Sequence, residues 1–324
     1  MLKPKVSVII PVYKVEKYIE KCARSLFEQT LKEIEYIFVN DCSPDESISI
    51  LNEIIKQYPE RKSWIRIIHH DRNKGLTSTR NTGISIAQGE YIAHCDSDDW
   101  VEPTMYDEMY MCAKETSADA VYCDINMVYE NYNEIYKAAK ISTNKNDFLR
   151  NYIVSVWTSL CNTLIKSEIY KKYNLYSPEH LCYCEDFWLS VRLFHYANKV
   201  SYINKPFYNY NRNNGGSIMH SLNRKTEQEE RKAYLETIAF FNEVGVGNEY
   251  KREMSWRILK STHDSALYLS RYNEFLTIYP EAHKYIWSCP YVNFKCKFIM
   301  WLLHFKLLRP LGIMLISIRD FLKR

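Results

Sequence analysis

Apolar and polar segments alternate regularly over the first hundred residues of the chain. Val6–Val12 is a continuous apolar, β-branched run, which is typical of a strand buried on both faces of a sheet. Glu16–Gln29 then places its apolar residues at helical spacing. The alternation repeats, with strands expected at 34–39, 64–68 and 91–95 and helices at 47–58 and 77–87. This rhythm predicts an α/β fold with a mostly parallel central sheet flanked by helices.

Beyond residue 100 the pattern is less regular. The elements expected there are a helix over 105–116, a strand over 120–125, a helix from Cys182 to about Ala197 and a strand over 199–203. A polar, glycine-containing loop follows at Asn211–Ser217, and residues 225–288 are predicted to be helical with a break near Gly245–Asn248. The chain is therefore expected to carry a helical C-terminal extension.

Polar residues gather where three of the predicted strands end, at Pro11–Tyr13, Asn40–Asp45 and Asp96–Asp99. In parallel α/β sheets, ligands bind outside the carboxyl ends of the strands. The three clusters therefore indicate one binding site at one edge of the sheet.

The run Asp96-Ser97-Asp98 indicates divalent-metal chemistry. Residues two apart in an extended segment point to the same side, so both carboxylates can face one ligand. Two close carboxylates repel a diphosphate unless a cation lies between them. Mg²⁺ or Mn²⁺ takes oxygen ligands from one or two carboxylates and completes its shell with phosphate oxygens and water. The alternative is an acidic turn in which Asp98 or Asp99 caps the helix that begins at Met105.

Two further polar segments have both a functional and a structural explanation. In Asn40–Asp45, an amide or carboxylate can hydrogen-bond a nucleobase or ribose, whereas Ser43 or Asp45 can instead cap the next helix. Arg80 lies on a predicted helix that faces the same edge, where a guanidinium can meet phosphate oxygens. A lone arginine on a helix is otherwise a solvated side chain.

Together these motifs resemble glycosyltransferase family 2, whose members are inverting enzymes with the GT-A fold that use nucleotide-diphosphate sugars. The motifs are Val6-Ser-Val-Ile-Ile-Pro-Val-Tyr13, Asn40-Asp41-x-Ser43-x-Asp45, Asn73-x-Gly75-x-x-Ser78-x-Arg80-Asn81-x-Gly83 and Asp96-Ser97-Asp98-Asp99. The resemblance is close over the first third of the chain and thinner to about Ser217. It implies a Rossmann-like sheet of the GT-A type.

The resemblance also implies roles for individual residues. Those expected to bind the nucleotide-sugar are Pro11, Tyr13, Asn40, Asp41, Arg80, Asp96 and Arg212. Asp96 and Asp98 are expected to hold Mn²⁺ or Mg²⁺. The chain departs from the family pattern at Asn40 and Cys42, where two acids and a glycine are common, and at Cys95, where a larger apolar residue is usual. Asn40 keeps an acceptor oxygen but carries no charge, so base recognition is expected to differ.

The pair Glu185-Asp186 matches the position of the family's general base, which implies that Asp186 is the catalytic residue. A carboxylate near the acceptor hydroxyl takes its proton as the hydroxyl attacks the anomeric carbon. Phe187 and Trp188 can partly desolvate Asp186 and raise its basicity. The alternative is that both acids only complement the dipole of a helix N-terminus.

Arg212 and His220 bracket the Gly215-Gly216 loop. Family members often have a mobile segment at this place, and such a loop can close over a bound diphosphate. The alternative is an ordinary polar loop.

Composition and cysteine spacing narrow the functional classes. The 324 residues are 46% hydrophobic and 25% charged, which excludes a wholly disordered chain, and the net charge of +4 is too small for general nucleic-acid binding. No Cys-x-x-Cys occurs among ten cysteines and no cleavable secretory signal precedes Pro4, so we expect free thiols in the cytoplasm. No Gly-x-Gly-x-x-Gly follows the first strand, which excludes a nicotinamide dehydrogenase.

The segment 291–324 differs in kind from the rest of the chain. It carries seven basic side chains against one acidic side chain, interleaved with apolar and aromatic residues. This pattern favours a peripheral position on an anionic membrane surface. His304, Lys306, Arg309 and Pro310 break the apolar run and disfavour a membrane-spanning helix. The alternative is a helical pair packed on the catalytic domain.

We therefore expect a catalytic domain over 1–220, with a nucleotide-sugar half over about 1–100 and an acceptor half over about 101–220. A helical extension over 221–290 and the basic segment 291–324 follow. The predicted function is inverting transfer of one sugar, hexosyl or N-acetylhexosaminyl, from a UDP-linked donor. The acceptor is expected to be a hydroxyl of a glycan or lipid-linked molecule in cell-surface polysaccharide synthesis, at the inner membrane face.

Two alternatives come from other classes. A sugar nucleotidyltransferase would need a glycine-rich loop after the first strand, and Pro11-Val-Tyr-Lys-Val-Glu16 has no glycine. A catalytically inactive nucleotide- or sugar-binding module is disfavoured by the presence of both Asp98 and Asp186.

Overall fold

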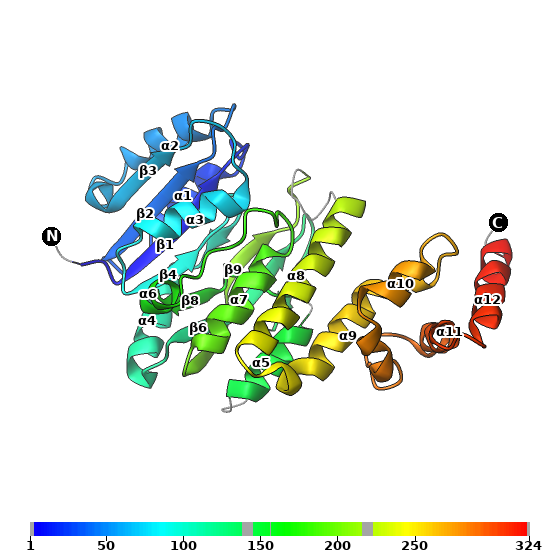
Figure 1. Cartoon of the computed structure of the whole chain (residues 1–324). Helices are drawn as coiled ribbons and strands as arrows, with labels where there is room; N and C mark the ends of the chain where they lie inside the picture. The colour runs from blue at the N-terminus through cyan, green and yellow to red at the C-terminus, as the bar shows by residue number, and fades with distance from the viewer. Residues whose placement is uncertain (1–2, 138–144, 156, 216–222, 323–324) are drawn as a thin grey trace. The chain divides into compact units, whose positions relative to one another are not determined.

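The computed structural model describes residues 3–137, 145–155, 157–215 and 223–322. The chain divides into two compact units (Figure 1). We call them the sheet unit, Met1–Tyr152 with Trp157–Leu222, and the helical unit, Ile153–Val156 with Asn223–Arg324.

A mixed sheet, with the strand order β3-β2-β1-β4-β8-β6-β9-β5 and β7 paired to β6, forms the centre of the sheet unit. The described strands are β1 (Val6–Val12), β2 (Ile34–Asn40), β3 (Ile65–His69), β4 (Tyr91–His94), β5 (Trp100–Val101), β6 (Ala120–Val128), β7 (Asn133–Tyr136), β8 (Thr163–Lys166) and β9 (Val200–Asn211). The first four strands are parallel, and β8 runs antiparallel to both β4 and β6. The predicted α/β class and the four predicted N-terminal strands are confirmed.

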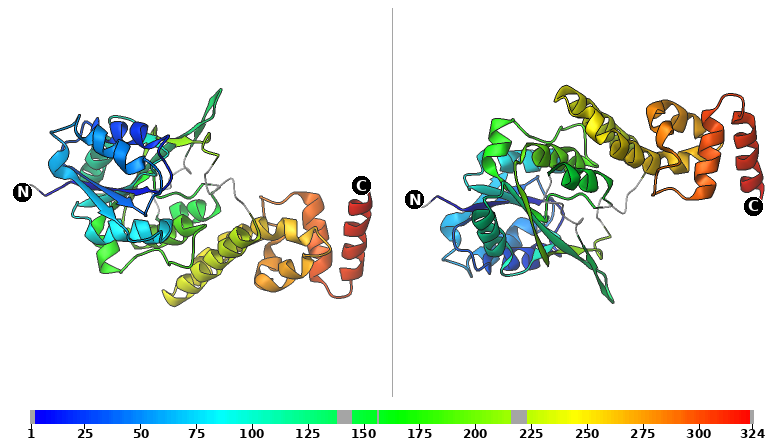
Figure 2. Two further views of the ribbon diagram at one scale, coloured as in Figure 1. Left: turned by 90° about the horizontal axis from the view of Figure 1, so that it is seen from above. Right: turned by 90° about the horizontal axis from the view of Figure 1, so that it is seen from below.

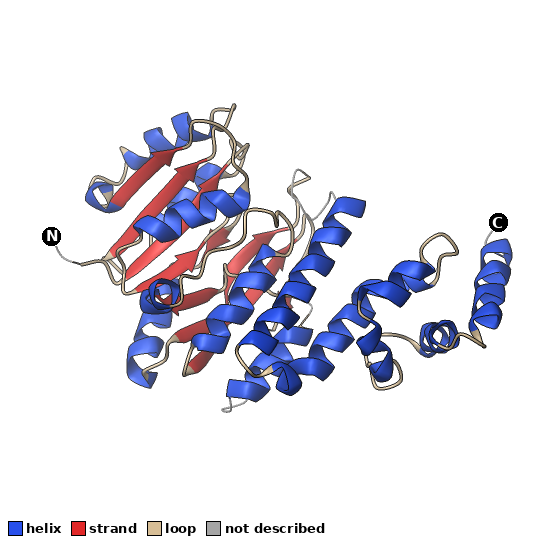
Figure 3. Ribbon diagram, viewed as in Figure 1, coloured by secondary structure: helices blue, strands red, loops and turns tan. Residues whose placement is uncertain are grey.

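Helices cover both faces of this sheet, as Figure 3 shows. They are α1 (Ile19–Phe27), α2 (Ser47–Ile55), α3 (Leu76–Ile86), α4 (Met105–Thr116), α5 (Lys145–Val154), α6 (Ser167–Lys172), α7 (Glu185–Tyr196) and the short η1 (Lys62–Trp64). Because strand side chains alternate, Val8 and Ile10 join the core cluster that includes Leu26 of α1. Ile9 faces α3, where a Cβ on Gly83 would lie 2.4 Å from Ile9 Cγ2. Gly83 therefore lets α3 approach β1 closely, which fixes the position of Arg80 one turn earlier.

The strand register brings polar residues together at the carboxyl edge of the sheet. Val12 of β1 pairs with Asn40 of β2, and Asn40 pairs with His69 of β3. Asp96 is the second residue after β4, which is the other neighbour of β1. The predicted convergence of the strand-end clusters therefore follows from the parallel pairing.

The helical unit contains α8 (Arg224–Glu243), α9 (Gly247–Ala266), α10 (Tyr272–Ile278), η3 (Pro280–Tyr285), α11 (Phe294–His304) and α12 (Arg309–Leu322). Asn223 caps α8, because its side-chain oxygen accepts hydrogen bonds from the backbone N–H groups of Lys225 and Thr226. The predicted break near Gly245 is confirmed, and Gly245 has a φ of 80°, a conformation that glycine adopts without strain. Among the described helices, none has both the length and the apolar character needed to cross a bilayer.

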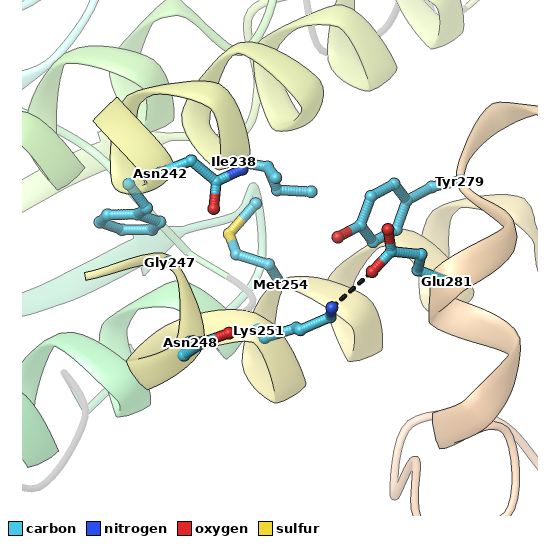
Figure 4. Close-up of a pocket in the computed structure, with 9 residues that line it drawn as sticks. Ile238, Asn242, Gly247, Asn248, Lys251, Met254, Tyr279 and Glu281 are labelled. Atoms are coloured by element: carbon cyan, nitrogen blue, oxygen red, sulfur yellow. Dashed lines mark ion pairs between the residues drawn. The ribbon is translucent and has the colours of Figure 1, made fainter. Parts of the chain in front are cut away.

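A pocket of about 160 Å³ lies among α8, α9 and η3 of the helical unit (Figure 4). Its floor is apolar, with the buried side chains of Phe241 and Met254. The Lys251–Glu281 ion pair, with 2.5 Å between Nζ and Oε2, joins α9 to η3 beside it.

Glu274 links three arginines of the helical unit. Its carboxylate accepts a hydrogen bond from Arg231 Nη1 at 2.7 Å and another from Arg224, and Arg271 Nη2 lies 3.6 Å away. Partial burial opposes ionisation of Glu274, but the hydrogen bonds from Arg224 and Arg231 outweigh it and lower the pKa from 4.5 to about 2. The pair with the buried Arg231 is therefore expected to stabilise the unit.

We predict that Glu274→Gln lowers the free energy of unfolding at pH 7 by about 1–2 kcal/mol, because it removes the nearer carboxylate from the buried Arg231 and leaves Glu227, 3.8 Å away, as its counter-charge. The depressed pKa means that the contribution is fully present above pH 4.5 and is lost as the pH falls through about 2. Denaturant unfolding from pH 7 to pH 2 should therefore show the wild type and the variant converging in acid. The control is Glu281→Gln, in a pair whose glutamate is 54% exposed, which should change the unfolding midpoint little. Equal losses in both variants would contradict the assignment.

Candidate active site

The loop after β4 is tied to the end of β1 and to the C-terminal end of β9. Ser97 is buried and its hydroxyl donates to the carbonyl oxygen of Pro11 at 2.6 Å. Asp99 is buried as well, and its carboxylate accepts hydrogen bonds from Tyr208 Oη at 2.5 Å and from the backbone N–H of Asn211 at 2.8 Å. These contacts bury Ser97 and Asp99 and leave Asp96 and Asp98 partly exposed.

Arg80 brings three carboxylates together. Its Nη1 donates to Glu185 Oε1 at 2.8 Å and to Asp186 Oδ1 at 2.5 Å, and its Nη2 donates to Asp96 Oδ1 at 2.7 Å. The residue is 1% exposed, so the interpretation of Arg80 as a solvated helix residue is wrong. The guanidinium thus contacts carboxylates from the loop after β4 and from the first turn of α7, which are far apart in the sequence.

Burial sets the proton affinities of the two acids at the start of α7. Burial, followed by the charge of Asp186, raises the pKa of Glu185 to about 8. Burial also raises the pKa of Asp186, although the Arg80 guanidinium acts in the opposite direction. The side chain of Asp186 is 20% exposed and that of Glu185 is 8% exposed, so Asp186 is the more accessible of the pair.

Two asparagine side chains contact Asp98: Asn211 Nδ2 donates to its backbone carbonyl oxygen at 3.2 Å, and Asn214 contacts its carboxylate. The Oδ2 of Asp98 accepts a hydrogen bond from Asn214 Nδ2 at 2.7 Å. Burial and the negative charge of Asp96 raise the pKa of Asp98, so the two carboxylates are close enough to repel each other.

The donor set of Asp96 and Asp98 suits a divalent cation. Within the described ranges, no group of three or more His, Cys, Asp or Glu side chains is placed to hold a metal ion. Mg²⁺ and Mn²⁺ nevertheless bind readily to one or two carboxylates when phosphate and water supply the remaining oxygens. The repulsion that raises the pKa of Asp98 is what a bound cation would relieve. The residues present therefore fit the expected ion.

Asn40 and Asp41 make framework contacts at the end of β2. Asn40 accepts a hydrogen bond from the backbone N–H of Ser43 at 2.9 Å, and its amide lies 3.1 Å from His69 Nδ1. Asp41 is 2% exposed. Its carboxylate accepts hydrogen bonds from the backbone N–H groups of residues 74 and 75, both at 2.8 Å, and lies 2.7 Å from His70 Nδ1. Asp41 thereby anchors the turn that starts α3, the helix of Arg80.

The remaining expected residues lie around this centre. Tyr13, just after β1, is 40% exposed. The guanidinium of Arg212 lies 5.8 Å from the ring centres of both Tyr129 and Tyr210, and its Nε has no hydrogen-bond partner among the described residues. Gly216 and His220 of the predicted loop fall outside the described residues.

The structure also decides between the capping alternatives. The N-cap of α4 is Thr104, and no side chain caps it, so the interpretation of Asp98 or Asp99 as a helix cap is wrong. Asp45, by contrast, accepts hydrogen bonds from the N–H and the hydroxyl of Ser47, the first residue of α2. Glu185 and Asp186 both lie in the first turn of α7, where an ionised carboxylate complements the helix dipole, and both also contact Arg80.

Several residues of the site had no predicted role. They are Tyr208, which fixes Asp99, Asn214, which fixes Asp98, and the His69-His70 pair, which contacts Asn40 and Asp41. The signal for the histidines is their place at the end of a predicted strand. Tyr208 and Asn214 carry no signal beyond belonging to a polar segment.

Comparison with known proteins agrees with the motifs. Residues 7–174 match the family model described as Glycosyl transferase family 2. The uncharacterized glycosyltransferase EpsJ of Bacillus subtilis (strain 168) is 31% identical over 266 residues, which cover 78% of this chain and 74% of EpsJ. The chain therefore belongs to glycosyl transferase family 2, and it is a glycosyltransferase.

Two further comparisons extend over most of the chain. The minor teichoic acid biosynthesis protein GgaB of Bacillus subtilis is 27% identical over 300 residues, covering 86% of this chain and 32% of GgaB. The crystal structure of S. aureus TarS 1-349 in complex with UDP-GlcNAc has a TM-score of 0.69 at 20% identity, covering 98% of this chain and 92% of TarS 1-349. The structural likeness confirms the expected GT-A type fold.

We predict that Arg80→Gln destabilises the sheet unit by about 3–5 kcal/mol, because it leaves buried carboxylates without their shared cation. Denaturant unfolding followed by circular dichroism measures this loss. The matched control is Arg66→Gln: Arg66 is 36% exposed, and its partner Glu35, although buried, keeps hydrogen bonds from the Ser7 hydroxyl and the Gln88 backbone N–H, so a smaller loss of about 1–2 kcal/mol is expected. An Arg80 variant as stable as the Arg66 variant would show that the carboxylate cluster does not need its cation.

Proposed function

We propose that this glycosyltransferase moves one sugar from a UDP-linked donor to an acceptor hydroxyl with inversion, and that Asp186 is the general base. The observation that supports the proposal is the gathering of Asp96, Glu185 and Asp186 on Arg80 beside Asp98, at the carboxyl edge of a GT-A sheet. Membership of the family decides against the nucleotidyltransferase alternative.

Asp186 is favoured over Glu185 as the base for two physical reasons. Asp186 is the more exposed of the two acids, so an acceptor hydroxyl can reach its carboxylate more readily, although that carboxylate also accepts hydrogen bonds from the backbone N–H of Leu160, at 3.4 Å from Oδ2, and from the Ser159 side chain. Burial and the charge of Asp186 raise the pKa of Glu185 to about 8, which favours Glu185 as the acid of the pair that keeps its proton. Asp186 would take the hydroxyl proton as the oxygen attacks the anomeric carbon.

The donor side of the proposed site depends on charge. Asp96 and Asp98 would hold Mn²⁺ or Mg²⁺, which supplies positive charge where the departing diphosphate becomes more negative. Arg212 is the proposed second phosphate contact, since its Nε is unpaired among the described residues. Arg80 would act as a positioning residue that fixes Asp96 relative to Asp186. Pro11, Tyr13, Asn40 and Asp41 would frame the nucleotide.

We further propose that the acceptor is a glycan or a lipid-linked molecule of cell-surface polysaccharide synthesis. Two similarities support this: one to GgaB, a minor teichoic acid biosynthesis protein, and one to TarS, which binds UDP-GlcNAc in its crystal structure. A lipid-linked acceptor would be reached by an enzyme that lies on the inner face of the cell membrane. Segment 291–324 is the proposed contact, since it is basic and rich in aromatic residues.

The donor can be identified by ligand-induced stabilisation. In a panel of nucleotide sugars with Mn²⁺, a UDP-sugar should raise the unfolding temperature, because a ligand at a hundred times its Kd stabilises the fold by about 2.7 kcal/mol. The same panel on Asp98→Asn should give a much smaller, Mn²⁺-independent shift. The proposal fails if no nucleotide sugar stabilises the wild type, or if the variant responds to Mn²⁺ equally.

The base can be tested with two isosteric variants of neighbouring acids. Asp186→Asn should leave the donor-induced thermal shift intact and lower the rate of UDP release by about 10²–10⁴-fold. Glu185→Gln should keep most of the rate, because a protonated carboxyl and an amide have the same shape and charge. The opposite order of the two rates would assign the base to Glu185.

A further inference from the structure

Exposed apolar surface is concentrated at the C-terminal end of the helical unit. Within the described ranges, ten of the seventeen exposed large hydrophobic side chains lie between Trp287 and Phe321. This stretch contains α11 and α12, which lie side by side in both views of Figure 2, in orange and red. So much exposed apolar area on two neighbouring helices marks an interaction surface rather than ordinary exterior.

Helix α11 is apolar on two opposite faces. One face packs into the unit through Cys296, Met300 and Leu303, all buried. The other face carries Phe294, Phe298 and Trp301, whose spacing of four and three residues places them in one stripe along the helix, and Phe305 continues the spacing just after the helix ends. Phe294 is 71% exposed, so this stripe is not part of the core.

Trp287 extends the stripe beyond the helix. Its ring centre lies 5.8 Å from that of Phe294 and 6.2 Å from that of Trp301, and Trp301 lies 5.2 Å from Phe305. The five rings therefore form one connected aromatic surface, which we call the α11 seam (Trp287, Phe294, Phe298, Trp301 and Phe305).

A second stripe runs from the turn before α12 to the end of that helix. The α12 seam (Leu307, Leu311, Met314, Ile318 and Phe321) has alternating spacings of four and three residues, and its members are 42% to 95% exposed. The opposite side of α12 packs on α11. A Cβ on Gly312 would lie 3.2 Å from Leu303 Cδ2, and Ile316 is fully buried. Both helices thus bury one side against the unit and expose the other.

The charges around the seams favour an anionic partner. Lys295, Lys297, Lys306 and Arg309 lie on the same two helices and the turn between them, whereas the single acid of the segment, Asp320, is already bonded to Arg319. Two copies of this surface would repel each other, which disfavours self-association through it. Trp and Phe interleaved with Lys and Arg are the composition that lies in the interface of an anionic bilayer.

We propose that the α11 and α12 seams insert together into the headgroup–acyl boundary of an anionic lipid bilayer, where the surrounding lysines contact the phospholipid phosphates. At 1.5 Å per residue, α11 and α12 are about 17 and 21 Å long, shorter than the roughly 30 Å hydrocarbon core, so they lie in the membrane plane. This deepens the proposed membrane contact by naming its residues, and it adds Trp287, which precedes the basic segment. It does not depend on sugar transfer.

The test is flotation of the full chain with vesicles of phosphatidylcholine alone and with vesicles containing 30% phosphatidylglycerol. The wild type should float with the anionic vesicles only, and its binding should weaken as salt is raised. Lys295→Gln and Lys306→Gln should each weaken binding about fivefold. The triple variant Phe294→Ser, Leu307→Ser, Phe321→Ser removes the most exposed side chains of both seams and should abolish flotation.

A matched control removes the same kind of surface elsewhere. Met111, Tyr132 and Ile135 of the sheet unit are 48%, 60% and 56% exposed, and their triple serine variant should float like the wild type. Equal circular dichroism spectra and unfolding temperatures for both triple variants show that each is folded. The proposal is overturned if the wild type ignores anionic vesicles or if the seam variant still floats. It is also overturned if light scattering shows that the wild type is a dimer without lipid and that, of the two triple variants, the seam variant alone is a monomer. Donor-induced stabilisation, measured separately, reports on the sugar-transfer proposal alone.

Discussion

The candidate active site of this protein depends on one buried arginine, Arg80, whose guanidinium holds three carboxylates. Asp96 and Asp186 are far apart in the sequence, and like charges cannot be buried together without a counter-charge. Arg80 supplies that charge, with hydrogen bonds of 2.5 to 2.8 Å to Asp96, Glu185 and Asp186. Several other features of the site place Arg80 or one of its partners.

The framework around Arg80 explains why several polar residues are turned inward. Asp41 anchors the turn that begins α3, and Gly83 lets the same helix approach β1, so both ends of the Arg80 turn are fixed. Tyr208 and the Asn211 backbone fix Asp99, and through it the loop of Asp96. Backbone N–H groups and a tyrosine hydroxyl thus donate to the carboxyl groups of Asp41 and Asp99. Such uncharged donors cost less to bury than additional ions would.

The sequence predicts the buried parallel strands at the N-terminus of this fold better than the later strands that complete the sheet. Continuous apolar runs such as Val6–Val12 are unambiguous because the strands are buried on both faces. The short β8, four residues long, and the far half of β9, where polar and aromatic residues alternate, give no such signal. The acids at 96, 98 and 186 could be singled out by motif and resemblance. Their attachment to Arg80 could not, because it depends on packing between segments about a hundred residues apart.

The boundary between the two units has a consequence for how the molecule unfolds. Ile153–Val156 belongs to the helical unit although the sheet unit surrounds it in sequence, and Arg257 of α9 donates hydrogen bonds to the carbonyl oxygens of Ile153 and Ser155. The polypeptide therefore passes between the units three times rather than once. Cutting the chain after residue 222 would separate residues 153–156 from Arg257, which hydrogen-bonds their carbonyl oxygens. The two fragments made by that cut are therefore not expected to fold as independent cooperative units.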